Sequence, residues 1–187
     1  MPPPQASPSS RSTGPITAAG CRRRMTLSVY QQLIAEEGIG SVTARMIADW
    51  LDVVAALAGL GLADSAHVSV FGMSMGARFG LPTAAALGPR LQGAVLGKFG
   101  IREAWPLCAG LCDPGLITKA AQAVSAPVLY HVQWDDEFFP RDGQFELFGA
   151  LASSDKQLIA RPGAHAHTRP EDETMWQDFI RHNARRR

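Results

Sequence analysis

The stretch that decides the fold is VSVFGMSMG, residues Val68 to Gly76. Its apolar first half predicts a buried strand, and a helix-like stretch follows it. Between them lies the pattern G-x-S-x-G, in which Gly72 and Gly76 flank Ser74. In a strand–turn–helix context this pattern exposes a serine on a sharp turn, where side chains at both glycine positions are expected to collide with the neighbouring strand and helix. Ser74 is therefore the candidate nucleophile.

A candidate acid follows the next readable strand. Residues 126–132, APVLYHV, form an apolar run after a proline and predict a second buried strand. The run leads into Asp135 and Asp136, and a carboxylate just past a strand end is well placed to orient a histidine. Both aspartates are candidates on this ground. His131 lies inside the predicted strand, which favours a core histidine over a catalytic one.

A candidate base follows a third strand. Residues 157–160, QLIA, predict a short strand, and the loop after it carries His165 and His167 ahead of a helix near 171–181. Serine, aspartate and histidine thus follow three strands in that chain order, with enough chain between them for helical crossovers. Together they indicate nucleophilic acyl transfer.

Four short segments resemble dienelactone-hydrolase-like serine hydrolases of the α/β-hydrolase superfamily. They are the serine turn FGMSMGARFGLP at 71–82, the strand start APVL at 126–129, the acid loop QWDDEFFP at 133–140 and the histidine loop PGAH at 162–165. The resemblance extends over roughly residues 41–182. It implies an α/β fold in which helices flank a mainly parallel sheet, and cleavage of a carboxylic ester, lactone or related acyl bond without a metal or organic cofactor.

The resemblance also assigns roles to residues. By its motifs Ser74 is the nucleophile, Asp136 the acid and His165 the base, and these motifs favour Asp136 over Asp135 and His165 over His167. The backbone N–H of Met75 is expected to stabilise the oxyanion.

Two tryptophans are candidate substrate-binding residues. Trp134 lies beside the candidate acid, although core packing explains it equally well. Trp105 lies in the segment after a predicted strand at 93–96, where insertions in such proteins often cover the site.

The sequence departs from the family pattern ahead of the serine. Between Met25 and Ser74 it predicts only two helices, the first at 27–37 and the second capped by Ser41 and ended by Gly59 and Gly61, followed by one strand. Strands 1 to 4 are expected to be missing, so that the sheet comprises strands 5 to 8. The loop that supplies a second oxyanion donor is missing with them, and such a loss typically lowers the rate about a hundred- to a thousandfold.

The same departure predicts an open sheet edge. The strand at 68–70 is expected to lack a partner on one side, and an unpaired apolar edge favours association with another chain. An alternative to the enzyme is thus an inactive or impaired fold that self-associates, or that needs a partner to complete its sheet.

Composition bounds the remaining classes. The chain has 187 residues, 46% of them hydrophobic, which suits one domain at 25–187 behind a Pro-, Ser- and Arg-rich tail at 1–24 that is predicted to be disordered. A formal charge of +1 gives no general attraction to nucleic acid, and no apolar run is long enough to cross a membrane. Three cysteines give no paired disulfide framework, which favours reduced thiols and a cytoplasmic location. Cys108 and Cys112 are four residues apart, but with no histidine nearby they do not predict a zinc site.

Overall fold

The computed structural model describes residues 26–104 and 110–185. The predicted tail at 1–24, Trp105 and Cys108 lie outside these residues, so the predictions made for them stay predictions. Within the described ranges, no helix is both long and apolar enough to cross a membrane.

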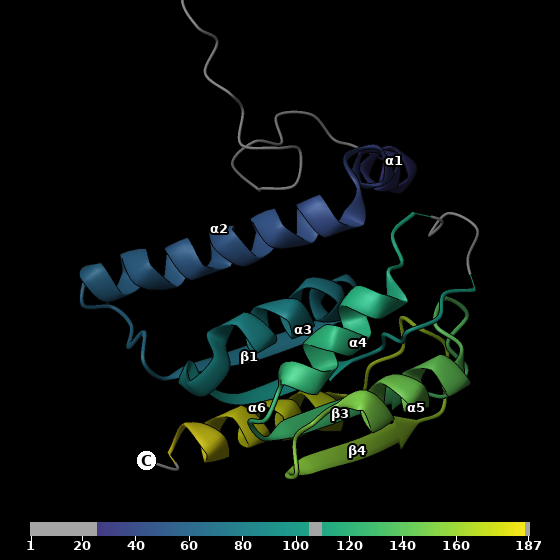
Figure 1. The fold of residues 1–187 in the computed structure, drawn as a ribbon. Coiled ribbons are helices and arrows are strands. Elements are labelled where there is room, and N and C mark those ends of the chain that lie inside the picture. Colours follow the sequence, from purple (N-terminus) through teal and green to yellow (C-terminus); the bar gives the residue numbers. More distant parts are fainter. Residues whose placement is uncertain (1–25, 105–109, 186–187) are drawn as a thin grey trace, which may run out of the picture.

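Helices and strands alternate along most of the chain (Figure 1). The elements are α1 (Leu27–Glu37), α2 (Ile39–Gly59), β1 (Val68–Met73), α3 (Met75–Leu87), the 3-10 turn η1 (Gly88–Arg90), β2 (Leu91–Gly97), α4 (Pro114–Ala123), β3 (Val128–Gln133), α5 (Arg141–Ala150), β4 (Lys156–Arg161) and α6 (Pro170–Ala184). Each predicted strand is present. β1, β2 and β4 extend beyond their apolar runs because flanking residues continue the ladder, whereas β3 begins at Val128, two residues later than predicted.

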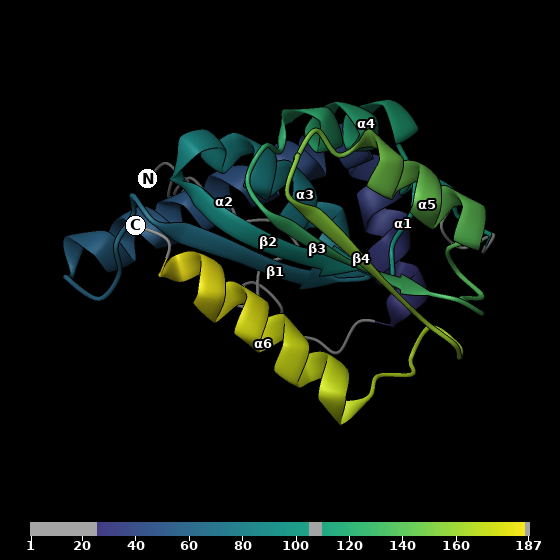
Figure 2. The same ribbon diagram turned by 90° about the horizontal axis from the view of Figure 1, so that it is seen from below.

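The four strands form one parallel sheet in the order β1-β2-β3-β4. Helix α6 covers one face, while α3, α4 and α5 cover the other (Figure 2). Both faces of the inner strands are therefore covered, which explains why β3 is buried along its whole length. This arrangement confirms the predicted α/β class. Because all strands are parallel, their carboxyl ends share one edge of the sheet, and the loops after them meet there.

Helix α2 begins earlier than predicted. Gly38, at a φ of 87°, ends α1 and directly precedes the first residue of α2. Ser41 lies inside the first turn, so the prediction that it caps the helix is wrong. The helix ends at Gly59, as predicted, and Gly61 follows with a φ of 69°.

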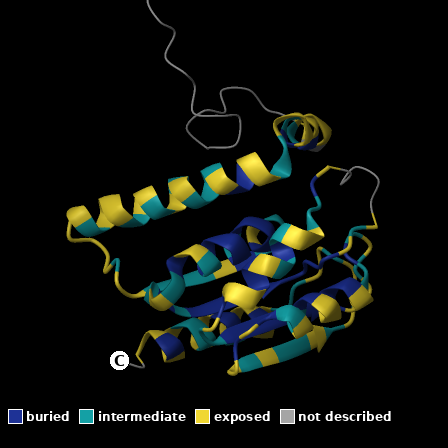
Figure 3. Cartoon of the chain, in the orientation of Figure 1, coloured by how far each residue is buried: buried dark blue, intermediate teal, exposed yellow. Residues whose placement is uncertain are grey.

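Strand β1 is an edge strand in the described part of the chain, with α2 extending beyond it (Figure 1). Much of α2 is exposed (Figure 3), and Trp50 on this helix and Phe71 on β1 are 51% and 57% exposed. A cavity of about 500 Å³ lies between α2, β1 and α3. Part of the apolar stripe of α2 packs on α3, through Val42 and Met46 against Phe79, and Trp50 lines the cavity.

Candidate active site

Ser74 occupies the turn between β1 and α3 with a φ of 56° and a ψ of −119°. A non-glycine residue in such a conformation costs about 1–3 kcal/mol, which surrounding contacts must offset. The Ser74 N–H donates to the Gly97 carbonyl at the end of β2 (2.9 Å), and the Ser74 carbonyl accepts from Ala77 and Arg78 in α3. Both neighbouring elements therefore hold the serine at the carboxyl edge of the sheet.

The two glycines of the turn differ in what surrounds them. A Cβ atom on Gly72 would lie 2.3 Å from the carbonyl oxygen of Gly76, so the predicted clash at Gly72 is confirmed. No atom lies within 4 Å of a Cβ placed on Gly76, so the predicted clash there is wrong. Gly76 lines the cavity beneath α2, which leaves that side of the turn open.

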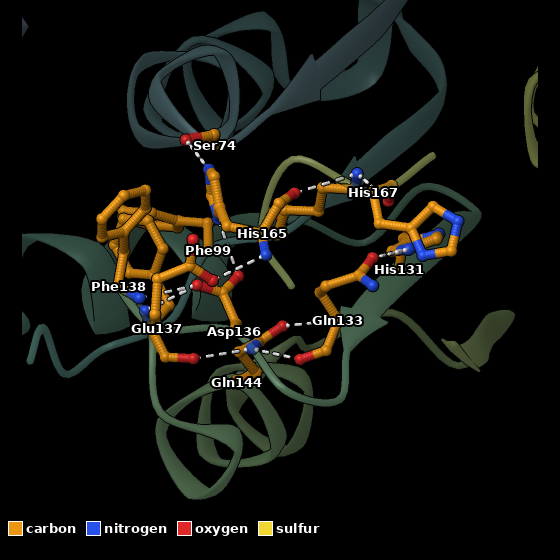
Figure 4. A network of polar contacts seen from close by, with 12 residues as sticks. Ser74, Phe99, His131, Gln133, Asp136, Glu137, Phe138, Gln144, His165 and His167 are labelled. Carbon is orange, nitrogen blue, oxygen red and sulfur yellow. Dashed lines mark hydrogen bonds and ion pairs between the residues drawn. The ribbon is translucent and has the colours of Figure 1, made fainter. Parts of the chain in front are cut away.

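Three side chains from distant parts of the chain meet at this edge (Figure 4). The Nε2 atom of His165 lies 2.7 Å from Oγ of Ser74, and its Nδ1 atom lies 2.8 Å from Oδ2 of Asp136. The Asp136 side chain is fully buried, and its Oδ1 atom accepts from the backbone N–H groups of Phe138 and Phe139, both at 2.9 Å. The carboxylate is thereby fixed with one oxygen toward the imidazole.

The rival residues point elsewhere. Asp135 accepts a hydrogen bond from the Gly163 N–H at 2.9 Å, so it ties the histidine loop and does not face the His165 ring. The carbonyl of His167 accepts from the ammonium of Lys98. The geometry thus joins Ser74 to the pair Asp136 and His165 that the motifs favoured.

His131 is a core residue, as its strand position predicted. It is fully buried in β3, its ring packs edge-on against Trp176 with 5.3 Å between ring centroids, and its Nε2 atom lies 3.1 Å from Oε1 of Gln133. Burial lowers the pKa of this histidine, which favours the neutral imidazole.

Sequence reasoning missed the side chains that hold the loop between β4 and α6. Glu137 accepts from the backbone N–H of His165 at 2.8 Å, and Gln133 donates to the Gly163 carbonyl at 2.9 Å. Lys98 donates to the same loop from the end of β2. The signal available in the sequence was Lys98 itself, a charged residue directly after an apolar strand, where a lysine needs polar partners. Burial lowers the pKa of Lys98, while the nearby charges of Asp136 and Asp172 oppose that shift.

Of the aromatic residues in the loop after β3, Phe138 and Phe139 lie beside His165, whereas Trp134 packs elsewhere. The rings of Phe138 and Phe139 lie 4.8 Å and 5.7 Å from the His165 ring, between centroids. Trp134 instead packs against α5, with the Arg141 guanidinium 4.3 Å from its ring centroid and Phe145 close by. No ring contact joins Trp134 to His165 in the described residues, so its substrate-binding role stays a prediction.

Met75 is the first residue of α3. The first N–H groups of a helix have no partner within it, which leaves the Met75 N–H free of helical bonding beside the serine. The Met75 side chain packs against a cluster that includes Ile34 of α1 and Val42 of α2. No group of three or more His, Cys, Asp or Glu side chains suited to a metal ion occurs among residues 26–104 and 110–185.

Several solved structures are similar to this chain. A cold-adapted esterase from an Arctic intertidal metagenomic library aligns with a TM-score of 0.68 and 29% identity, over 86% of this chain and 65% of that chain. A metagenome-derived lipolytic enzyme aligns with a TM-score of 0.59 and 18% identity over 81% of this chain and 77% of its own. An acetyl xylan esterase from Paenibacillus sp. R4 gives 0.61 and 17%, over 74% and 52%. The last two identities show a shared fold alone.

No protein-family model matches the chain, and no curated protein matches its sequence. The dienelactone-hydrolase-like subtype accordingly stays a prediction. The parallel sheet, the strained serine between β1 and α3, and the similarity to esterases and lipases point to one superfamily. The chain belongs to the α/β-hydrolase superfamily and forms a partial version of its fold.

Proposed function

We propose that this protein is a serine hydrolase that cleaves a carboxylic ester, lactone or related acyl bond through Ser74, His165 and Asp136. The observation that carries the proposal is the continuous contact from Ser74 Oγ to His165 Nε2 and from His165 Nδ1 to Asp136 Oδ2. A loosely packed surface serine would not need a strained backbone held by two neighbouring elements. The buried, doubly hydrogen-bonded carboxylate further supports a role in orienting the imidazole.

In the proposed mechanism, the Ser74 hydroxyl donates its proton to His165 Nε2 as its oxygen attacks the substrate carbonyl carbon. Asp136 accepts the Nδ1 hydrogen bond and stabilises the imidazolium. The imidazolium then protonates the leaving alkoxide, so that the C–O bond breaks and an acyl-enzyme forms. A water molecule, deprotonated by the same histidine, then attacks the acyl carbon, and the imidazolium protonates Ser74 Oγ as the bond between this oxygen and the acyl carbon breaks. The acid is released and Ser74 returns to its starting state.

The oxyanion of each tetrahedral intermediate is expected to accept a hydrogen bond from the Met75 N–H. The N-terminus of α3 adds a favourable field for this charge. If the Met75 N–H is the sole donor, turnover is expected to be about a hundred- to a thousandfold below that of a hydrolase with two donors. A second polypeptide segment that supplied another N–H donor would restore this rate without any change in the triad.

The chain spans 65% of the length of the Arctic esterase, so its substrate class is proposed and is not taken over from that enzyme. The similarity to the Arctic esterase favours a carboxylic ester over a peptide. The rings of Phe138 and Phe139 beside His165 suit a small apolar acyl group. A lactone substrate, as in dienelactone hydrolases, fits the same chemistry.

A series of p-nitrophenyl esters tests the proposal. We expect the wild-type chain to hydrolyse the acetate and butyrate faster than the octanoate, and Ser74→Ala to lose this activity while keeping its circular dichroism spectrum. The matched control is Ser125→Ala, at an exposed position ahead of β3 and so at the opposite end of the sheet. Equal rates for Ser74→Ala and the wild type would contradict the proposal.

The open edge of β1 favours a second function, self-association. We propose that two copies pair through this edge, because the same apolar surface on each copy is complementary to itself about a two-fold axis. Exposed Phe71 and Trp50, and the cavity that both line, would be covered in such a pair. Unpaired edges of this kind favour association between chains. Sedimentation velocity over a hundredfold range of concentration tests it, and a monomer throughout would contradict it.

A further inference from the structure

Lys98 is a buried cation at the carboxyl edge of the sheet that the proposed chemistry does not use. It directly follows β2, is 4% exposed and has a φ of 48°, a conformation that few non-glycine residues adopt. Its backbone N–H donates to the His131 carbonyl at 2.8 Å, which continues the β2–β3 pairing by one residue. From there the side chain crosses the carboxyl end of the sheet to the loop between β4 and α6.

The acceptors of the Lys98 ammonium lie in one short segment. Nζ donates to the His165 carbonyl (3.2 Å), the His167 carbonyl (2.7 Å) and the Thr168 hydroxyl (2.6 Å). An ammonium has three donors, so these contacts satisfy it completely. The segment is the loop between β4 and α6 that carries the candidate base. Lys98 thereby joins the end of β2 to a loop that follows the far strand of the sheet.

The two backbone polar groups of His165 are held from opposite sides. Glu137 accepts from its N–H (Figure 4). Lys98 donates to its carbonyl. Burying an ammonium is costly unless it is fully hydrogen-bonded, and an apolar side chain in its place would avoid that cost. The three hydrogen bonds of Lys98 offset that cost, and because one of them holds the His165 carbonyl, they also fix the residue that carries the imidazole.

We infer that Lys98 is a positioning residue for the base, whose ammonium fixes the His165 loop so that Nε2 stays within reach of Ser74 Oγ. The inference rests on the proposed hydrolase function. Lys98 does not touch the reacting atoms, and its effect passes through the backbone of His165. Without it, the loop would keep its Glu137 and Gln133 contacts but lose its tie to β2.

The chain offers a closely matched control. Lys156, at the start of β4, also donates to three carbonyls, those of Phe148, Gly149 and Leu151, between 2.8 and 3.2 Å. These acceptors belong to the C-terminal end of α5, at the other edge of the sheet. Lys98→Met and Lys156→Met thus each remove one ammonium with three acceptors, and only the first faces the histidine loop.

Two measurements test the inference. With p-nitrophenyl butyrate we expect Lys98→Met to lower kcat about a hundredfold with KM changed less than twofold, because a misplaced base slows the chemical step. Lys156→Met should lower Tm but leave kcat near the wild-type value. In hydrogen exchange followed by mass spectrometry, the peptide covering 162–168 should exchange faster than the wild type in Lys98→Met and at the wild-type rate in Lys156→Met.

The two readouts separate this inference from the proposed function. If the wild type shows no hydrolysis, the function fails, and faster exchange confined to 162–168 in Lys98→Met still supports the positioning role. If the wild type is active, equal kcat in the two lysine variants overturns the inference, as does unchanged loop exchange. Should Lys98→Met not fold, Thr168→Val removes one of the three acceptors and is read in the same assays, with a smaller loss of kcat expected.

Discussion

His165 Nε2 lies 2.7 Å from Ser74 Oγ although 91 residues separate them in the chain. The parallel sheet makes this meeting possible, because the loops after β1, β3 and β4 leave from one edge. Side chains near the sheet then fix the position of His165. Asp136 orients its imidazole ring, while Glu137 and Lys98 hold its backbone N–H and carbonyl. Proposed activity therefore depends on loop positioning as well as on the three reacting groups.

The two neighbouring aspartates should differ sharply in their effect on catalysis. Asp136→Asn replaces the carboxylate that faces His165 Nδ1, and we expect kcat for p-nitrophenyl butyrate to fall about ten-thousandfold, because the imidazole loses its orienting charge. Asp135→Asn weakens only the bond to the Gly163 N–H and should lower kcat far less. Equal losses in the two variants would show that neither aspartate has a special role.

The two glycines of the serine turn should respond in opposite ways to alanine. In Gly72→Ala the new Cβ meets backbone atoms of Gly76 at 2.3 and 2.5 Å, and backbone cannot move aside as a side chain can. We expect the free energy of unfolding in urea to fall by about 3 kcal/mol or more. Gly76→Ala adds a methyl group to open space within a helix and should raise it by up to about 1 kcal/mol. A destabilised Gly76→Ala would mean that the cavity beside it is filled.

Stability should fall in mild acid because of His131. Burial lowers the pKa of this histidine, so the folded chain binds fewer protons than the unfolded chain between the lowered pKa and about 6.5, the ordinary value. Its contribution is fully present above about pH 6.5 and is lost as the pH falls toward the lowered pKa. The slope from one such group is at most about 1.4 kcal/mol per pH unit.

His131→Gln isolates this contribution, since it removes the titrating ring and retains a donor for Gln133. Urea unfolding at pH 8 and pH 5 should show a smaller loss in the variant than in the wild type. The other histidines are the same in both proteins and cancel in the comparison. Parallel losses would indicate that His131 does not govern the acid response.

Charge at the open edge should block self-association. Phe71→Lys places an ammonium on the exposed side of β1, where lysines commonly prevent edge pairing, and should shift the sedimentation coefficient toward the monomer. Leu62→Lys changes a residue of similar exposure in the turn after α2 and should leave association intact. An equal effect of both variants would point to general loss of surface hydrophobicity.

Much of the fold followed from local patterns. Apolar runs predicted all four strands, around Val70, Ala94, Leu129 and Leu158. Ser74, Asp136 and His165 follow the ends of three of these strands in that chain order. The choice of Asp136 over Asp135 came from motif spacing, and periodicity alone left it open. Local patterns suffice here because parallel strands are apolar on both faces.

Contacts between distant segments were beyond the sequence. Lys98 and Glu137 act on a loop 67 and 28 residues away, and nothing in their immediate neighbours signals that partner. The open space beside Gly76 arises because α2 stands off from β1, which no residue near Gly76 encodes. Helix α2 begins directly after Gly38 and not at the predicted cap Ser41, because Gly38, with a φ of 87°, joins α1 to α2 without a longer loop.

The central claim, that Ser74 is an activated nucleophile, is tested most directly by intact mass after exposure to a fluorophosphonate probe, with the adduct mapped by peptide sequencing. We expect one adduct, located on Ser74, and its loss in His165→Ala and in Ser74→Ala. A folded wild-type chain that stays unlabelled, or that is labelled elsewhere, would show that Ser74 is not an activated nucleophile.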